Sequence, residues 1–533
     1  MFPISLSSIR FVPFVCALVF AKVNAQSISV DVESFKVMGN TLLTSAQLQS
    51  VVSGARGKMT LPDIQKVAQD LQQAYRAAGY GAVIVQVPQQ TPDKGVIELE
   101  VIEGKLSQIQ VAGIQAFTKD NVLRSLPALK VGTTPLLADL DSELLMANEN
   151  PAKSVKVVFQ PGEKKAQVEA LVVVEELPID RTTVTFDNTG NTSTGRFRLS
   201  LGYQNANFLD NDSVLGFRLV TSPSAPSQVG IFSTSLRVPL YAQKTFLEWS
   251  ALASNTRNAP NQTPAGELRF SGQGVSLGAR AIWTLASLNE YKHQVSAGVE
   301  SRRYRNDCQL GSFGSAGCGT AAASIDVFPL TVGYSIQKPG ALQFNASAVR
   351  NIPVGRAGSD AAFNNVRSGA VSGYSIFRGS AAGLSSVAPD WSLIWRADAQ
   401  ISIKALVPAE QFGIGGASSI RGYPERALSG DSGATASAEV RTLVASPSSG
   451  QKVTEPQSLY LGLFIDSGVV SNRLNTSCSP SKSTCNLWGA GAAVTYRPTN
   501  SALIRLDVAR AGKAVNDVKA GDWRGHINMS VTF

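Results

Sequence analysis

Four cysteine residues are spaced so that they could form disulfide bonds. Cys308 and Cys318 bracket the Gly/Ser-rich segment DCQLGSFGSAGCG, and Cys478 and Cys485 bracket the segment SCSPSKSTC. Close pairs of this kind are typical of loop-closing disulfides in exported chains. The alternative is a metal site, but the sequence has only two His residues and neither lies near a cysteine pair. We therefore predict the disulfides Cys308–Cys318 and Cys478–Cys485, and no metal site.

The sequence offers few residues for catalysis. The two histidines, His293 and His526, leave little for a Ser-His-Asp arrangement, and His526 lies on the last predicted strand. The Gly runs GIGG and GAGAA are not followed by a helical pattern, so a phosphate or dinucleotide site is not indicated. The net charge of +9 is spread along the chain, which argues against nucleic-acid binding. We expect neither an enzyme nor a cofactor.

Two short motifs in the C-terminal part of the chain could hold a loop in place. They are Arg421-Gly422-Tyr423, and Phe464, Asp466 and Gly468 in the segment FIDSG. The first motif follows the Gly-rich stretch FGIGGASSI, and glycine allows a long loop to fold back sharply. The second motif alternates along a predicted strand, so its three residues share one face. From these residues alone, an ordinary hairpin with a solvated carboxylate is the favoured interpretation.

The beginning of the chain predicts export. Residues 1–25 contain Arg10, then an apolar run over 11–20 and small residues before Gln26, a pattern typical of a secretory signal peptide. Cys16 lies inside the apolar run without the context of a lipid-attachment site, so no lipid anchor is expected. No later run of about 20 apolar residues could form a membrane-spanning helix.

Residues 26–178 are predicted to contain one α+β order twice. The first copy, residues 26–104, has a strand at 35–38, a helix after Thr44, a helix at 61–78, and strands at 83–87 and 96–102. The second copy, residues 105–178, has a strand at 109–111, helices at 119–126 and 136–148, and strands at 155–159 and 166–174. Each copy reads β-α-α-β-β, which indicates an internal repeat.

Residues 179–533 are predicted to form a transmembrane β-barrel. Apolar and polar residues alternate here, as in Ile504, Leu506 and Val508 against Arg505 and Asp507. A soluble β-sandwich also alternates, but the many charges on the polar face favour a water-filled lumen. At about 9–11 residues per strand, this length suits about 16 antiparallel strands, with short turns on one side and long loops on the other. The last segment, 526–533, ends on an aromatic residue, as many outer-membrane barrels do.

The mature chain resembles the transporters of two-partner secretion systems, the TpsB or ShlB/FhaC/HecB family. This family belongs to the barrel-assembly superfamily and carries polypeptide-transport-associated (POTRA) domains before its barrel. The segments that carry the resemblance are FKVMGNTLLTSAQL, AAGYGAVIVQVPQQTPDKGVIELEVIEGKL, FDNTGNTSTGRFRLSLGYQNANFLDNDS, SSIRGYPE and LFIDSGVV. They occur in the family's order and cover essentially the full mature chain. The resemblance implies two POTRA domains, at 26–104 and 105–178, and a barrel at 179–533.

The resemblance also implies roles for individual residues. A loop near 411–430 folds into the barrel, where Arg421 pairs with Asp466 on the inner wall. The residues that match the family's first POTRA domain are Gly79, Tyr80, Pro88, Gly95, Glu103 and Gly104. Turn and core positions are one explanation for these six residues; the other is that they mark a region where an extended client adds to a strand edge.

The implied function is export of another protein. POTRA domains in the periplasm would capture an unfolded exoprotein, a haemolysin, adhesin or contact-dependent inhibitor with an N-terminal secretion domain, and pass it through a pore in the bacterial outer membrane. Outer-membrane lipid and, during biogenesis, the barrel-assembly machinery are further expected partners. The alternatives are a barrel-assembly factor, a passive porin and a barrel enzyme. The first strand lies only about ten residues after the predicted cleavage site, so the plug helix of some family members is not expected here.

Overall fold

The computed structural model describes most of the chain after the predicted signal peptide. The described residues are 29–164, 166–257, 261–263, 266–313, 315, 318, 322–445, 457–473, 478 and 483–533. The predicted signal peptide and the segment that would hold a plug helix lie outside them. Contacts divide the chain into two compact units, Met1–Gly104 and Lys105–Phe533. Within the described ranges, no helix is both long and apolar enough to cross a bilayer.

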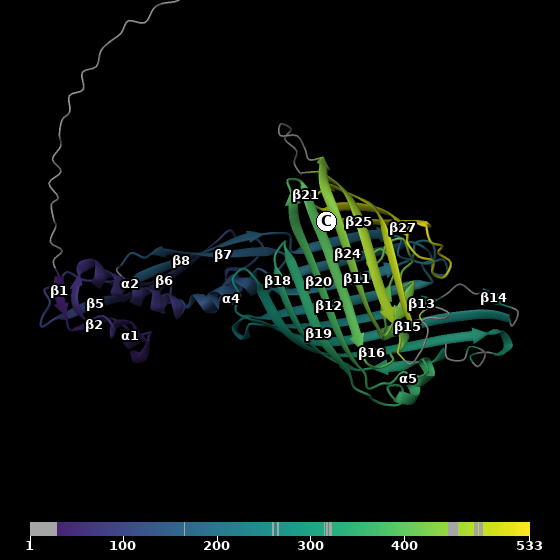
Figure 1. Cartoon of the computed structure of the whole chain (residues 1–533), viewed down its shortest axis with the longest axis horizontal. Helices are drawn as coiled ribbons and strands as arrows, with labels where there is room; N and C mark the ends of the chain where they lie inside the picture. The colour runs from purple at the N-terminus through teal and green to yellow at the C-terminus, as the bar shows by residue number, and fades with distance from the viewer. Residues whose placement is uncertain are drawn as a thin grey trace, which may run out of the picture. The chain divides into compact units, whose positions relative to one another are not determined.

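The first unit has a three-stranded sheet covered by two helices (Figure 1). Its elements are β1 (Ser29–Val32), β2 (Ser34–Met38), α1 (Ser45–Val52), β3 (Gly57–Thr60), α2 (Leu61–Ala77), β4 (Val83–Gln86) and β5 (Val96–Glu103). In the sheet, β2 pairs with β5 in parallel and β4 pairs with β5 in antiparallel register. Thr44 caps α1 with a capping box, as its position predicted.

The predicted order of the first unit needs two corrections. An additional two-stranded sheet joins β1 to β3, and at four residues each these strands are too short to be predicted from alternation. The 3, 4 spacing of Leu61, Ile64, Val67, Ala68, Leu71 and Tyr75 predicts one buried stripe on α2, and all of these residues except Leu61 are buried. Its first member, Leu61, is 57% exposed because it occupies the first turn, before the helix meets the sheet.

The second α+β unit, residues 105–176, repeats this topology. Its elements are β6 (Lys105–Ala112), α3 (Lys119–Arg124), α4 (Leu137–Ala147), β7 (Lys153–Pro161) and β8 (Gln167–Glu176). Again the first strand pairs in parallel with the last, and the intervening strand pairs in antiparallel register. Gly39 and Gly113 occupy equivalent turns with φ of 84° and 86°. A Cβ atom at either position would lie within 2.4 Å of a carbonyl oxygen of the facing strand, so both turns require glycine.

The remaining strands form a closed antiparallel barrel. Its principal strands are β9 (Asp180–Asp187), β10 (Arg198–Phe208), β11 (Ser213–Thr221), β12 (Val229–Leu240), β13 (Thr245–Arg257), β15 (Gly266–Thr284), β16 (Lys292–Leu310), β18 (Pro329–Lys338), β19 (Leu342–Asn351), β20 (Ser375–Ala388), β21 (Trp391–Ser402), β24 (Ser432–Ala445), β25 (Ser458–Ser471), β26 (Thr484–Thr499), β27 (Ala502–Ala511) and β28 (Trp523–Thr532). The three-residue strands β14 (Asn261–Thr263) and β17 (Ile325–Val327) extend two of the pairings. These sixteen principal strands, counted among the described residues, confirm the predicted architecture.

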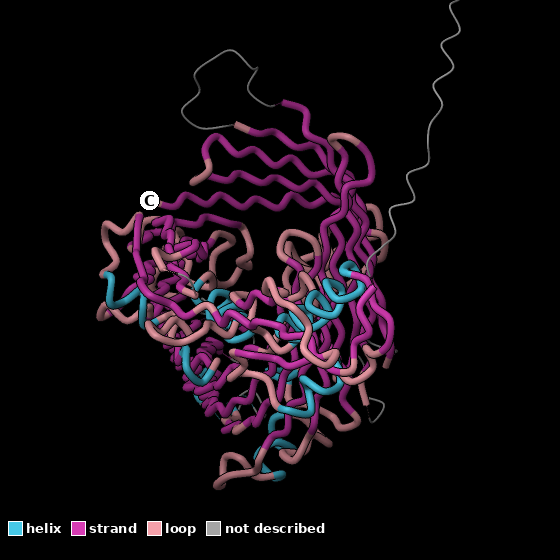
Figure 2. Tube along the Cα trace, turned by 90° about the vertical axis from the view of Figure 1, so that its left-hand side faces the viewer, coloured by secondary structure: helices cyan, strands magenta, loops and turns pink. Residues whose placement is uncertain are grey.

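The two faces of the barrel wall follow the sequence pattern. On β25, Phe464, Asp466 and Gly468 point into the lumen, whereas Leu463 and Ile465 are 71% and 54% exposed on the outside. An apolar outer face in contact with lipid and a polar inner face are what a spanning barrel requires. Figure 2 shows the strands of this wall in magenta.

Loop lengths differ between the two ends of the barrel. The end reached by the second α+β unit has short turns such as 209–212, 241–244 and 389–390. The opposite end carries long connections, including 352–374 with α5 (Asp360–Val366) and 403–431. The predicted division is therefore correct, with one exception: the connection 446–457, which follows β24, is also long.

Candidate functional site

The long loop between β21 and β24 carries the Arg421 motif into the barrel. The short hairpin of β22 (Phe412–Ile414) and β23 (Leu428–Gly430) forms its base, preceded by a 3₁₀ turn, η4 (Pro408–Glu410). Gly415 and Gly416 both have φ of 107°, a conformation that favours glycine, and they turn the chain inward at the tip of β22. Ile420, Arg421 and Tyr423 are each at most 3% exposed.

Arg421 and Asp466 form a bidentate ion pair on the inner wall. The Nε and Nη2 atoms of Arg421 donate to the two carboxylate oxygens of Asp466 at 2.7 and 2.8 Å. The backbone N–H of Arg421 also donates to Asp466, at 3.0 Å. The guanidinium lies 3.2 Å from the ring centroid of Phe464. The two motifs are thus brought together as the resemblance implied, in a geometry that fixes a guanidinium in both position and orientation.

Small residues make space for this loop. A Cβ atom at Gly489 would lie 2.1 Å from the carbonyl oxygen of Arg421, and one at Gly468 would lie 2.7 Å from Ile420. Gly422 has φ of 98° and passes close to the backbone of β27. The loop therefore contacts the wall through its backbone at Gly489 and Gly422 and through the Ile420 side chain at Gly468.

The ion pair belongs to a larger charged cluster that sequence reasoning missed. Nη1 of Arg421 donates to Glu439 at 2.9 Å and to Asp507 at 3.1 Å. Arg505 bridges the same two carboxylates at 2.6 and 2.7 Å. The alternation of β27 already placed Arg505 and Asp507 on the polar face, but the alignment of β24, β25 and β27 around the barrel is what makes them neighbours.

Two further contacts hold the motif. The N–H of Gly422 donates to Nε2 of His526 at 3.2 Å. The Tyr423 hydroxyl donates to the carbonyl oxygen of Trp488 at 3.1 Å and accepts from the N–H of Lys513 at 2.8 Å. His526, considered above only as a catalytic candidate, thus serves as a hydrogen-bond acceptor for the loop.

The base of the loop is anchored separately. Asp431 is fully buried and pairs with Arg367, which follows α5. It also accepts from the N–H groups of Leu406 at 2.9 Å and Arg473 at 2.8 Å. Glu410 pairs with Arg302 on β16 at 2.8 Å. Because these contacts lie near the ends of the loop and Arg421 lies near its middle, the loop is attached to the wall at several independent points.

The six POTRA-motif residues lie in turns and core positions of the first unit. Gly79 ends α2 with φ of 95°, Gly95 turns the chain with φ of 72°, and Tyr80 packs against the core. The carbonyl oxygen of Pro88 accepts from Gln90, and the N–H of Gly104 donates to Ala82.

Glu103 has a clear structural role. Its carboxylate accepts from the N–H groups of Thr41 at 2.7 Å and Leu42 at 3.0 Å. In the second α+β unit, Glu176 accepts in the same way from the N–H groups of Gln115 and Phe117. Because both units use a carboxylate at the end of their last strand to hold the turn after the first strand, these contacts explain Glu103 without a client.

The cysteines form two disulfides. Cys308 and Cys318 have Cα atoms 6.0 Å apart, and Cys478 and Cys485 have Cα atoms 6.2 Å apart, both within the usual range for a disulfide. Cys308 lies near the end of β16 and Cys485 near the start of β26, both on the long-loop side of the barrel. Their partners lie in the adjoining connections, so the disulfides close loops, as their spacing predicted.

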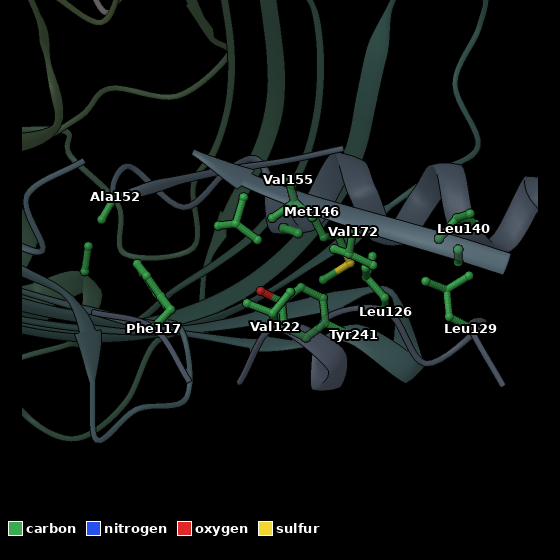
Figure 3. Close-up of a cluster of buried hydrophobic side chains, with 14 of the residues drawn as sticks. Phe117, Val122, Leu126, Leu129, Leu140, Met146, Ala152, Val155, Val172 and Tyr241 are labelled. Atoms are coloured by element: carbon green, nitrogen blue, oxygen red, sulfur yellow. The ribbon is translucent and has the colours of Figure 1, made fainter. Parts of the chain in front are cut away.

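The second α+β unit is joined to the barrel by a buried polar contact. Lys153 at the start of β7 donates to both carboxylate oxygens of Asp212 at 2.7 Å, and both side chains are almost completely buried. The hydroxyl of Tyr241, in the 3₁₀ turn η1 (Tyr241–Gln243), donates to the same carboxylate at 2.7 Å. Figure 3 shows Tyr241 among apolar side chains of the second unit, including Val122 and Leu126.

A sixteen-stranded barrel with an arginine-bearing loop in its lumen and an α+β unit at its short-turn end defines an outer-membrane protein with periplasmic domains. The sequence profile described as "Haemolysin secretion/activation protein ShlB/FhaC/HecB" matches residues 171–496. The profile "POTRA domain, ShlB-type" matches residues 30–104. The chain belongs to the ShlB/FhaC/HecB family and lies in the bacterial outer membrane, with its N-terminal domains in the periplasm.

Characterised relatives and solved structures agree with this assignment. The outer membrane transporter CdiB of Escherichia coli is 25% identical over 419 residues, covering 75% of this chain and 67% of CdiB. The heme/hemopexin transporter protein HuxB of Haemophilus influenzae is 23% identical over 189 residues, 35% of this chain and 33% of HuxB. The match thus spans about a third of the length of HuxB.

Two solved structures share the fold over nearly the whole chain. CdiB from Escherichia coli has a TM-score of 0.79 at 20% identity and covers 96% of this chain and 92% of that chain. CdiB from Acinetobacter baumannii has a TM-score of 0.70 at 16% identity, with coverage of 95% and 91%.

Proposed function

We propose that the protein is the outer-membrane transporter of a two-partner secretion system. It takes an unfolded exoprotein from the periplasm and passes it through the barrel. The observation that carries this proposal is the family match over residues 171–496, joined to a lumen that holds a loop fastened by Arg421 and Asp466. The assembly of other barrels and the passive passage of solutes are less well supported, because the match is to secretion proteins and a porin does not explain the repeated α+β units.

The client enters through the two α+β units. The sheet of the first unit ends in the strands β2 and β4, and an extended segment can add to such an edge by backbone hydrogen bonding. Exposed apolar residues on these strands, Met38 and Ile84, are 46% and 56% exposed and offer side-chain contacts. The client is a large haemolysin, adhesin or contact-dependent inhibitor with an N-terminal secretion domain. We assign no catalytic step and no cofactor.

The Arg421 loop controls the lumen. Its ion pair with Asp466 is buried and bidentate, so the loop has one defined position in the lumen. Breaking the pair to move the loop from this position requires a substantial free energy. Passage of a client requires space that the seated loop occupies, or a wall that the loop keeps rigid. In the second case the Arg421–Asp466 pair is necessary for secretion, and this is the case that we propose.

Secretion of an exoprotein of a two-partner system, co-expressed with this protein, tests the proposal. Deletion of residues 29–104 should abolish the exoprotein in the medium while the barrel remains in the outer membrane, as judged by its heat-modifiable migration in gels. Undiminished secretion would exclude a role for the first unit in client capture. Lys66→Gln, at an exposed position of α2, is a suitable control, because it leaves both edge strands unchanged.

A further inference from the structure

An apolar groove lies on the outer surface of the barrel at the long-loop end, where β26, β27 and β28 are neighbours. Its volume is about 720 Å³. Two indole rings, Trp488 and Trp523, border it, and small residues such as Ala490 and Ala492 form its floor. These side chains belong to the outward-facing rows of their strands, so the groove opens to the lipid and not to the lumen.

Arg510 places a positive charge in this groove. Leu506, Val508 and Arg510 form the outward row of β27, and Arg510 is exposed at its extracellular end. In the register of the sheet it lies directly opposite Ala490 on one side and Trp523 on the other. Among the described residues that line the groove, Arg510 is the only charged one, and its Nε donates a long hydrogen bond, 3.4 Å, to the carbonyl oxygen of Gly521.

An arginine on the lipid-facing row is tolerated only at the level of the headgroups. At the bilayer midplane it would cost about 2–4 kcal/mol, falling to about 0–1 kcal/mol near the interface. Tryptophan side chains prefer the same level. The combination of Trp488, Trp523 and Arg510 therefore places an apolar slot in the acyl region with a guanidinium beside the phosphates of the outer leaflet.

A second outer groove provides a comparison. It has a volume of about 510 Å³ and is bordered by Trp249 and Trp283, near the short-turn end of the barrel. Glu248 and Arg280 lie beside it in sequence but belong to the lumen-facing rows of β13 and β15, where they pair with each other at 3.0 Å, so the lipid-facing row of this groove carries no charge among the described residues. Paired tryptophans and an apolar floor thus occur at both grooves, but only the extracellular one offers an uncompensated cation.

We infer that the groove at Trp488, Arg510 and Trp523 is a binding site for lipid A, the phosphorylated and multiply acylated glycolipid of the outer leaflet. One acyl chain occupies the slot between the two indole rings. The Arg510 guanidinium binds a lipid A phosphate, a pairing suited to its planar donors. Lys513, which is exposed in the adjoining loop, adds positive charge on the same side of Trp488.

The same stretch of wall carries the Arg421 motif on its inner side. The Trp488 carbonyl accepts from Tyr423, and Gly489 contacts the backbone of Arg421. Gly422 lies against the backbone of Arg510 and Ala511. A lipid that orders this part of the wall from outside will therefore favour the seated loop inside, and by thermodynamic linkage the seated loop will favour the lipid.

Lipid binding to the purified full-length protein in detergent tests the inference. Native mass spectrometry should show retention of bisphosphorylated lipid A, at least tenfold weaker retention of dephosphorylated lipid A, and at least tenfold weaker retention of phosphatidylglycerol. Arg510→Gln should lower lipid A affinity at least tenfold. Arg257→Gln, at another exposed arginine near the same end of the barrel, should leave it unchanged. Equal retention by the Arg510→Gln variant, or no preference for lipid A over phosphatidylglycerol, would overturn the inference.

The slot and the coupling have tests of their own. A Cβ atom at Gly512 would lie 2.0 Å from the Trp488 ring, so Gly512→Leu should displace that ring and lower lipid A affinity, whereas Trp283→Ala at the second groove should not. Hydrogen exchange of residues 420–424 should slow at least twofold when lipid A is added to the parent protein, and not in Arg510→Gln. Exchange that is unchanged in the parent protein would overturn the coupling to the loop.

Discussion

Asp466 accepts three hydrogen bonds from one residue, Arg421: two from its guanidinium and one from its backbone N–H. The carboxylate therefore specifies both the orientation of the side chain and the path of the loop backbone. Both groups are almost completely buried, so the loss of either partner leaves a charge without its counterpart inside the barrel.

Arg421→Lys should impair secretion nearly as strongly as Arg421→Ala. Lysine keeps the charge but cannot donate in parallel to both oxygens of Asp466 while contacting Glu439 and Asp507. We expect at least tenfold less exoprotein in the medium, with normal amounts of barrel in the membrane. Lys66→Arg, at a residue on the surface of the first unit, is the control. Secretion at the parent level in Arg421→Lys would show that charge alone is sufficient.

Gly489→Ala should displace the Arg421 loop from the barrel wall without removing any charge. The new methyl group would lie 2.1 Å from the carbonyl oxygen of Arg421. Steric overlap of this kind lowers the free energy of unfolding by about 1–3 kcal/mol. The matched control is Gly525→Ala, because a Cβ atom there has no neighbour within 4 Å. Limited proteolysis after the exposed Arg426 should become faster in Gly489→Ala only. Equal cleavage rates in the two variants would contradict the proposed close contact.

Lys153→Met should loosen the second α+β unit from the barrel. Removal of one member of a buried pair leaves the Asp212 carboxylate uncompensated, at a cost of about 3–5 kcal/mol. The double variant Lys153→Met/Asp212→Leu should recover most of that loss, because neither charge then remains buried. Thermal unfolding of the full chain, followed by calorimetry, distinguishes these cases. A double variant as unstable as the single one would argue that Tyr241 and Asn121, which also contact this pair, dominate the contact.

The stability of the second α+β unit should fall as the pH rises from about 4.5 to 7. Burial raises the pKa of Glu143 on α4 to about 7. The hydrogen bond that Glu143 accepts from the N–H of Ala128 acts in the opposite direction and lowers this pKa, but burial is the larger effect. The folded state therefore binds a proton more readily than the unfolded state in this interval, and this stabilisation is present below about pH 4.5 and lost above 7.

Glu143→Gln should remove that pH dependence, since glutamine can accept from the Ala128 N–H without ionising. The effect is on the order of 3 kcal/mol across the interval. Hydrogen exchange of α4 at pH 5 and pH 8 measures it. Glu175→Gln is the control, because Glu175 is exposed and paired only with exposed Lys156. A pH dependence that persists in Glu143→Gln would assign it to another group.

Replacement of the cysteines should destabilise loops and leave the barrel folded. Each disulfide closes a short connection, with sequence separations of 10 and 7 residues, so its loss restores about 2–3 kcal/mol of loop entropy to the unfolded loop. Cys478→Ser/Cys485→Ser should increase proteolysis of the loop between β25 and β26 without altering the heat-modifiable migration of the barrel. Peptide mapping without reductant should recover Cys308–Cys318 and Cys478–Cys485, and a crossed pairing would contradict the structure.

The sequence by itself determined the architecture. Alternation with a period of two separates a lipid face from a lumen face on every strand, so Leu463 and Asp466 could be assigned to opposite sides before any coordinates were known. The repeat of β-α-α-β-β was also visible locally, because it depends on helix periodicity and turn residues. Even the structural role of Glu103 could have been found from its counterpart in the repeat, Glu176.

Only the tertiary structure decided which charges meet. Glu439, Asp466 and Asp507 are spread over 69 residues of sequence, and they become neighbours because barrel closure and strand register bring β24, β25 and β27 to one side of the lumen. The lipid-facing groove has the same origin, since Trp488, Arg510 and Trp523 come from three strands aligned by that register. Periodicity within a strand specifies a face, but the distance between side chains on different strands depends on pairing that no local pattern contains.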